Sequence, residues 1–125
     1  MQETLVKKLI KRSCITINEN SLIRDLVNIL NKNKVGCVVV TSFKSDYPVG
    51  IVSERDLVRN YDKIINDNEF KVRDVMTKNI IFCNKNTSSQ ELMELMNQNK
   101  IRHIPIIEKK KLLGIVSIGD VVNRI

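Results

Sequence analysis

The chain has 125 residues, of which 42% are hydrophobic and 4% aromatic, and its formal net charge is +7. This length predicts about one domain with an aliphatic core. No apolar run approaches the roughly 20 residues of a membrane span, and the N-terminus does not resemble a signal peptide. We therefore expect a soluble, cytoplasmic protein with no membrane partner. The positive charge favours anionic partners, although solvated surface lysines explain it equally well.

The first half of the chain predicts the order β-α-β-β-α. Residues 14–17 form the expected opening strand, and apolar residues recur at helical spacing from Leu22 to Leu30, with Ser21 as the N-cap. Val38–Val40 is a β-branched run typical of a buried strand. A polar turn leads from it into a second strand at 49–52, which completes a hairpin. A second helix is expected from Glu54 to about Tyr61.

The second half predicts the same order. A helical turn at 72–76 is the counterpart of residues 6–10, and a strand is expected at 80–83. Thr87 and Gln90 predict a capping box for the next helix. A hairpin follows, with Lys109–Lys111 in a solvated turn, and the last helix runs over 118–124. We expect residues 1–62 and 72–125 to be two repeats, joined by a linker at 63–71.

One motif in these halves is repeated almost letter for letter. Gly50–Asp56 recurs as Gly114–Asp120, and both segments read Gly-Ile-Val-Ser-x-x-Asp. Upstream, Asn33-Lys34-Val35 returns as Asn99-Lys100-Ile101. Units this short bury too little surface alone, so the two copies are expected to pack on each other.

The Ser-x-x-Asp spacing has a structural and a functional interpretation. In the structural one, Ser53 or Ser117 caps the following helix, and the Asp favours the positive end of its dipole. In the functional one, the same helix start binds an anion, and the Asp carboxylate accepts two hydrogen bonds from a ribose diol. Gly50 and Gly114 would let a ligand approach the strand backbone.

The sequence offers few residues for catalysis or metal binding. Cys14, Cys37 and Cys83 are too scattered for a disulfide framework or a zinc site. His103 is the only histidine, and no P-loop or Ser/His/Asp set is present. We expect neither catalysis, nor a metal, nor a cofactor.

The repeated motif resembles that of a tandem pair of cystathionine β-synthase (CBS) domains, also called a Bateman module. Two further segments share this resemblance: the turn Val72-Arg73-Asp74-Val75-Met76-Thr77 and the strand Arg102-His103-Ile104-Pro105-Ile106. The resemblance extends over residues 4–125. It implies an α/β protein of the α+β type, in which two β-α-β-β-α repeats are related by a pseudo-twofold axis. It also implies a stand-alone module that forms a homodimer and binds AMP, ADP, ATP or S-adenosylmethionine.

The resemblance implies two unequal ligand sites. In this family a cleft takes its ribose Asp from one repeat, and part of its phosphate-facing residues from the start of a strand in the other. One site would then comprise Thr16, Ile17, Ser53, Arg55, Asp56, Arg102, His103 and Pro105. The second, weaker site would comprise Phe82, Cys83, Ser117, Gly119 and Asp120, and would receive the uncharged Gly36 and Cys37. For Ile17 and Phe82 a place in the core is an equally consistent interpretation, as is a structural role for His103.

These features favour a regulatory module that senses an adenosyl ligand and modulates a partner enzyme, a transporter or its own dimer. Two alternatives belong to other classes. One is a basic nucleic-acid-binding protein, whose affinity would fall steeply with salt. The other is a structural dimerisation module without a ligand.

Overall fold

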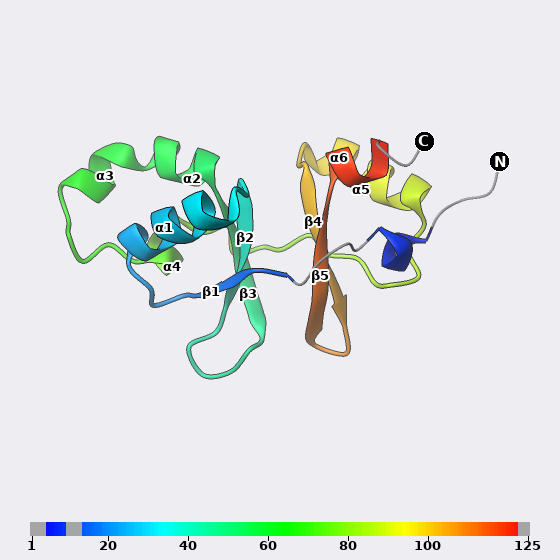
Figure 1. The fold of residues 1–125 in the computed structure, drawn as a ribbon, viewed down its shortest axis with the longest axis horizontal. Coiled ribbons are helices and arrows are strands. Elements are labelled where there is room, and N and C mark those ends of the chain that lie inside the picture. The colour runs from blue at the N-terminus through cyan, green and yellow to red at the C-terminus, as the bar shows by residue number, and fades with distance from the viewer. Residues whose placement is uncertain (1–4, 10–13, 123–125) are drawn as a thin grey trace. The chain divides into compact units, whose positions relative to one another are not determined.

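The computed structural model of the chain describes residues 5–9 and 14–122. Its fold is mixed α+β, as predicted, and it divides into two compact units (Figure 1). We call residues 15–80 the N-unit, and residues 81–125 together with 1–14 the C-unit. The N-unit contains β1 (Thr16–Asn18), α1 (Ile23–Asn33), β2 (Cys37–Thr41), β3 (Pro48–Ser53), α2 (Glu54–Arg59), α3 (Tyr61–Ile65) and α4 (Val72–Val75). The C-unit contains the 3₁₀ helix η1 (Val6–Lys8), α5 (Ser89–Asn99), β4 (His103–Glu108), β5 (Lys111–Ser117) and α6 (Ile118–Val122).

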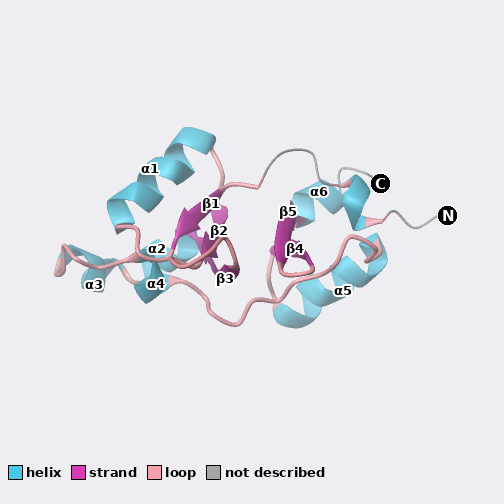
Figure 2. Ribbon diagram, turned by 90° about the horizontal axis from the view of Figure 1, so that it is seen from below, coloured by secondary structure: helices cyan, strands magenta, loops and turns pink. Residues whose placement is uncertain are grey.

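The N-unit is built on a three-stranded sheet with the order β1-β2-β3 (Figure 2). β1 runs parallel to β2, and β2 runs antiparallel to β3, with Cys37 opposite Ser53. Four successive residues of β2, from Cys37 to Val40, are buried. A continuous apolar run of this kind is expected where both faces of a strand are covered, so the predicted buried strand is confirmed.

The C-unit has a two-stranded antiparallel hairpin, β4-β5, in which His103 lies opposite Ser117. Its tight turn places Lys109 and Lys110 at positive φ, 49° and 65°, as a type I′ turn requires of both central residues. The lysines of this turn are exposed, in agreement with the predicted solvated loop.

The predicted opening strand at 80–83 is wrong for the C-unit. Only Cys83 pairs, in a parallel bridge with Ile106. The Cys83 N–H donates to the Pro105 carbonyl (3.0 Å), and the Ile107 N–H donates to the Cys83 carbonyl (2.9 Å). Pairing stops there because the chain turns at once: the Asn84 N–H donates to Thr87 Oγ1 (3.2 Å).

The helices α1 and α5 each begin one residue later than the predicted caps. For α5, Ser88 is the N-cap, and its Oγ accepts from the Glu91 N–H (3.1 Å). For α1, the N-cap is Leu22, whose aliphatic side chain makes no capping bond. Thr87 and Ser21 therefore lie just outside the helices that they were expected to cap.

The repeated Asn-Lys pair ends both long helices in the same way. Lys34 and Lys100 are C-caps in the left-handed region, with φ of 53° and 54°, a common way to end a helix. The preceding Asn33 and Asn99 each donate a side-chain N–H to the carbonyl four residues back, at 2.8 Å. This part of the repeat therefore has a structural role.

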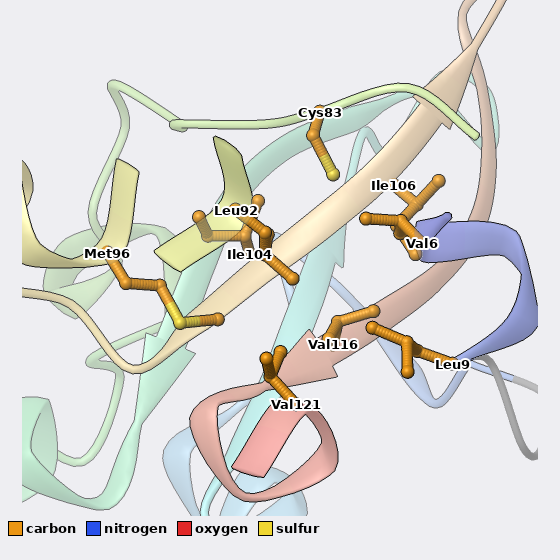
Figure 3. Close-up of a cluster of buried hydrophobic side chains, with 9 residues drawn as sticks. All are labelled: Val6, Leu9, Cys83, Leu92, Met96, Ile104, Ile106, Val116 and Val121. Atoms are coloured by element: carbon orange, nitrogen blue, oxygen red, sulfur yellow. The ribbon is translucent and has the colours of Figure 1, made fainter. Parts of the chain in front are cut away.

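The segments that open the two repeats each pack into the core of the other. In the C-unit, Val6 and Leu9 are buried among residues contributed by α5, β4, β5 and α6, and by Cys83 (Figure 3). The Val6 N–H donates to the Thr87 carbonyl (2.8 Å). In the N-unit, Val72 and Val75 of α4 occupy the corresponding place. Boundaries between sequence repeats therefore differ from boundaries between compact units.

The stretch 63–71, which composition marks as a linker, is ordered against the N-unit. α3 covers its first part, and Ile64 and Phe70 pack on the N-unit core. Two of its three apolar side chains therefore contact the core, while the third, Ile65, is exposed.

Candidate functional site

The first Ser-x-x-Asp segment lies where β3 passes directly into α2. Asp56 Oδ2 accepts hydrogen bonds from the Ser53 N–H (2.8 Å) and from Ser53 Oγ (3.2 Å). These bonds tie the carboxylate to the start of the helix, where a negative charge is favourable. The part of the structural interpretation that concerns Asp56 is therefore confirmed in the N-unit, whereas Ser53 Oγ donates to Asp56 and, among the described residues, makes no capping bond with a backbone N–H.

The second segment repeats this geometry between β5 and α6. The Ser117 N–H donates to Asp120 Oδ2 (2.9 Å), and the Asp120 N–H donates to Ser117 Oγ (3.1 Å). In both copies the hydrogen bonds formed within the described part of the chain use Oδ2 and leave Oδ1 open. Capping thus holds each carboxylate in place without using all of its acceptor capacity.

The residues at the start of β2 and of β4 occupy equivalent places beside these segments. The Glu54 N–H donates to the Gly36 carbonyl (2.9 Å), and the Ile118 N–H donates to the Arg102 carbonyl (2.9 Å). The structure therefore brings Arg102 beside the start of α6, whereas the small Gly36 stands at the corresponding place beside α2. Within its own unit, the start of α6 therefore has an arginine beside it, and the start of α2 has a glycine.

His103 is half-buried beside Ser117, its partner across the β4-β5 ladder. Burial lowers the pKa of His103, the Asp120 carboxylate raises it, and the Arg102 guanidinium lowers it, with burial the largest influence. The net effect favours the neutral imidazole. Inside the C-unit, the two basic residues predicted for the Asp56 site are thus near Asp120.

The residues predicted to line the base differ in exposure. Thr16 is exposed on β1, while the Ile17 side chain is only 4% exposed and lies in the N-unit core. Phe82 is 56% exposed, so the core interpretation is correct for Ile17 and wrong for Phe82. Cys83 is buried, and burial raises the pKa of its thiol to about 11, against a lowering by the Thr87 hydrogen bond.

The remaining predicted residues lie close to the motifs. Arg55 is exposed on α2, Gly119 lies in α6, and Pro105 is buried in β4. A Cβ built at Gly119 would meet Ser117 Oγ at 3.6 Å, an ordinary contact, so nothing there requires glycine.

The expected ligand access at Gly50 is wrong. A Cβ at this position would lie 2.6 Å from Met76 Sδ and 2.9 Å from the Thr77 carbonyl oxygen. The neighbouring Ile51 exchanges two backbone hydrogen bonds with Thr77, of 3.0 and 2.8 Å. Glycine is needed here because another stretch of backbone, rather than a ligand, comes close. The sequence signal for this contact was the turn at 72–77, whose partner could not be inferred from spacing.

Within the described ranges, no group of three or more His, Cys, Asp or Glu side chains is arranged to hold a metal ion. None of the described helices has the length and apolar character needed to cross a membrane.

Comparison with known proteins gives a consistent result. The family model described as "CBS domain" matches residues 6–63 and 72–125. The chain is 39% identical over 108 residues to the mitochondrial CBS domain-containing protein CBSX3 of Arabidopsis thaliana, covering 81% of this chain and 51% of that protein.

Two solved structures are also similar. The CBS-domain containing protein ATU1752 from Agrobacterium tumefaciens is 37% identical with a TM-score of 0.87, covering 98% of this chain and 94% of that one. The CBS domain protein PAE2072 from Pyrobaculum aerophilum, complexed with AMP, is 28% identical with a TM-score of 0.85, covering 94% and 89%. The chain spans 22% to 58% of the length of three curated relatives that it matches.

Proposed function

The chain belongs to the CBS domain family, and from this premise we propose that it is a regulatory module that binds an adenosyl ligand. The observation that carries the proposal is the AMP complex of the Pyrobaculum protein, which is similar over nearly the whole of this chain. AMP, ADP, ATP and S-adenosylmethionine share the adenosyl group and are the candidate ligands.

The geometry of the Ser-x-x-Asp segments supports a ribose-binding role. Asp56 and Asp120 are each fixed through Oδ2, and each has Oδ1 open within the described part of the chain. A side chain that is already ordered loses little conformational entropy when it binds a ligand. Capping and ligand binding are therefore compatible uses of one carboxylate.

We also propose that the two sites differ in affinity. The tighter site would use Asp56, Ser53 and Arg55 of the first repeat, together with Arg102 and His103 of the second. Hydrogen bonds to charged groups are worth about 1.5–3 kcal/mol each. A site that lacks such donors to phosphate should bind at least about tenfold more weakly.

The residues around Asp120 also give a physical basis for the opposite order of affinities, in which the Asp120 site binds more tightly. Arg102 and His103 lie near Asp120 in the C-unit, and if they act there, the Asp120 site would be the tighter one. Mutating the two aspartates separately distinguishes these assignments.

Calorimetry with AMP on the full chain is the test. Asp56→Asn keeps an acceptor for the capping bonds but removes the charge, and Asp120→Asn is its matched partner. We expect Asp56→Asn and Arg102→Gln to weaken the tight phase at least about tenfold, whereas Asp120→Asn and the exposed control Arg59→Gln leave it intact. Loss of the tight phase in Asp120→Asn alone would reverse the assignment. No heat with any adenosyl compound at millimolar concentration would refute the proposed function.

We propose a homodimer that forms through exposed apolar side chains of α2 and of α6. Val58 is 76% exposed and Val122 is 51% exposed, whereas their neighbours Leu57 and Val121 pack on the unit cores. Pairing of such faces would bury apolar surface. Light scattering should give twice the chain mass, and Val58→Glu should lower it. We also propose that the module regulates a partner protein, which is an enzyme or a transporter.

A further inference from the structure

A cavity of about 550 Å³ opens on the N-unit, between the start of α1 and the stretch from α3 to Phe70. Leu22, Ile64 and Phe70 give it apolar walls. Its volume lies in the range of about 300–1,000 Å³ that is usual for small-molecule pockets. None of its lining residues belongs to the Ser-x-x-Asp segments, so it is separate from the proposed adenosyl site.

Hydrogen bonds fix the walls of this cavity. The Glu69 N–H donates to Asp67 Oδ1 (2.9 Å), and the Phe70 N–H donates to the Asp67 carbonyl (3.2 Å). On the other side, Leu22 forms a β-bridge with Lys71. The cavity is therefore part of the folded N-unit and needs no rearrangement to form.

Two opposite charges border the apolar walls: the Arg24 guanidinium and the Asp67 carboxylate. Within the part of the chain that the structure describes, the Arg24 guanidinium has no hydrogen bond or ion pair, and Asp67 Oδ2 accepts none. A purely anionic ligand would pair with Arg24 but leave Asp67 without a partner, and a purely cationic ligand would do the reverse. A ligand that carries both charges and an apolar group satisfies the whole lining.

From this juxtaposition we propose that the cavity binds a zwitterionic α-amino acid with an apolar side chain. Arg24 pairs with the α-carboxylate, which a guanidinium can bind through two parallel hydrogen bonds. Asp67 Oδ2 accepts from the α-ammonium group. The ligand's side chain lies against Leu22, Ile64 and Phe70. The N-unit thereby has a second ligand site, independent of the adenosyl group.

An NMR titration of the full chain with L-leucine tests the proposal. We expect saturable shifts at the amides of residues 22–24 and 64–70. Leucinamide lacks the carboxylate and 4-methylpentanoate lacks the ammonium group, so each should bind about fivefold more weakly, the scale of one solvent-exposed ion pair. Equal binding of leucine and 4-methylpentanoate would overturn the zwitterion assignment.

Two variants locate the site. Arg24→Gln and Asp67→Asn change exposed side chains, and the asparagine keeps an acceptor for the Glu69 N–H, so both should fold. Each should weaken leucine binding about fivefold, whereas the exposed controls Arg59→Gln and Asp62→Asn should not. No saturable shift at millimolar leucine, or unchanged binding in Arg24→Gln, contradicts the proposal. AMP binding measured on the same samples is expected to stay unchanged, so failure here leaves the adenosyl function standing.

Discussion

Leu9→Ala should destabilise the C-unit, although residue 9 lies far in sequence from the rest of that unit. The Leu9 side chain is 1% exposed and is one of the nine described residues that form the buried C-unit core (Figure 3). Buried Leu→Ala substitutions cost about 2–5 kcal/mol, through lost transfer free energy and the cavity left behind. We expect about 3 kcal/mol from urea unfolding followed by circular dichroism. Lys8→Ala changes the exposed neighbouring residue and should stay within about 0.5 kcal/mol.

Hydrogen exchange shows where the stability is lost. In Leu9→Ala the protection of amides in β4 and β5 should fall, and in Val75→Ala the protection in β2 and β3 should fall instead, because Val75 lies in the N-unit core. If Leu9→Ala lowered protection in β2 and β3 and left β4 and β5 unchanged, the assignment of the N-terminal segment to the C-unit would be wrong.

Three further predictions concern single positions. Gly50→Ala places a Cβ against the Thr77 carbonyl and should cost about 1–3 kcal/mol by overpacking, while Gly119→Ala should not destabilise; a gain or no change at Gly50 would contradict this. Ser88→Ala removes the cap of α5 and should cost about 1 kcal/mol in urea unfolding. Ser88→Thr keeps the capping hydroxyl at this buried position without burying a charge, and should lose less. Because the folded pKa of His103 is lowered from 6.5, the unfolded chain binds the extra proton first, so stability should fall as pH drops through about 6.5. His103→Gln should flatten that part of the stability curve, and an unchanged slope would show that other groups dominate.

Apart from the strand expected at 80–83 and the helix α3, the order of elements could be predicted because each element depends on local patterns. The β-branched run of β2, the hairpins and the repeated motif all follow from residue spacing that the structure confirms. Both N-caps lie one residue after the predicted ones. Before α5, the neighbouring hydroxyl residue Ser88 takes the place expected for Thr87. Before α1, the N-cap is Leu22, which makes no capping bond, so side-chain chemistry does not mark this start.

Features that depend on distant contacts could not be predicted. Sequence similarity shows that residues 6–10 and 72–76 are alike, but it does not show which core receives each. The role of Gly50 depended on Thr77, and the exposure of Phe82 depended on the early end of strand pairing at Cys83. The cavity beside α1 draws its walls from residues about 40 positions apart, Leu22 to Arg24 and Ile64 to Phe70, which no local pattern connects.

The exchange of opening segments has a consequence for how such a chain can arise and be divided. A single repeat would present Val72 and Val75, or Val6 and Leu9, without a core of its own to receive them. Two copies of an ancestral half-length chain could complete both cores by exchanging these segments, as in a domain-swapped dimer. Fusion of the two genes would place both copies in one chain. The exchange of segments would then be intramolecular and would no longer depend on protein concentration. A break in the chain between the repeats should accordingly yield two fragments that fold only when they are mixed.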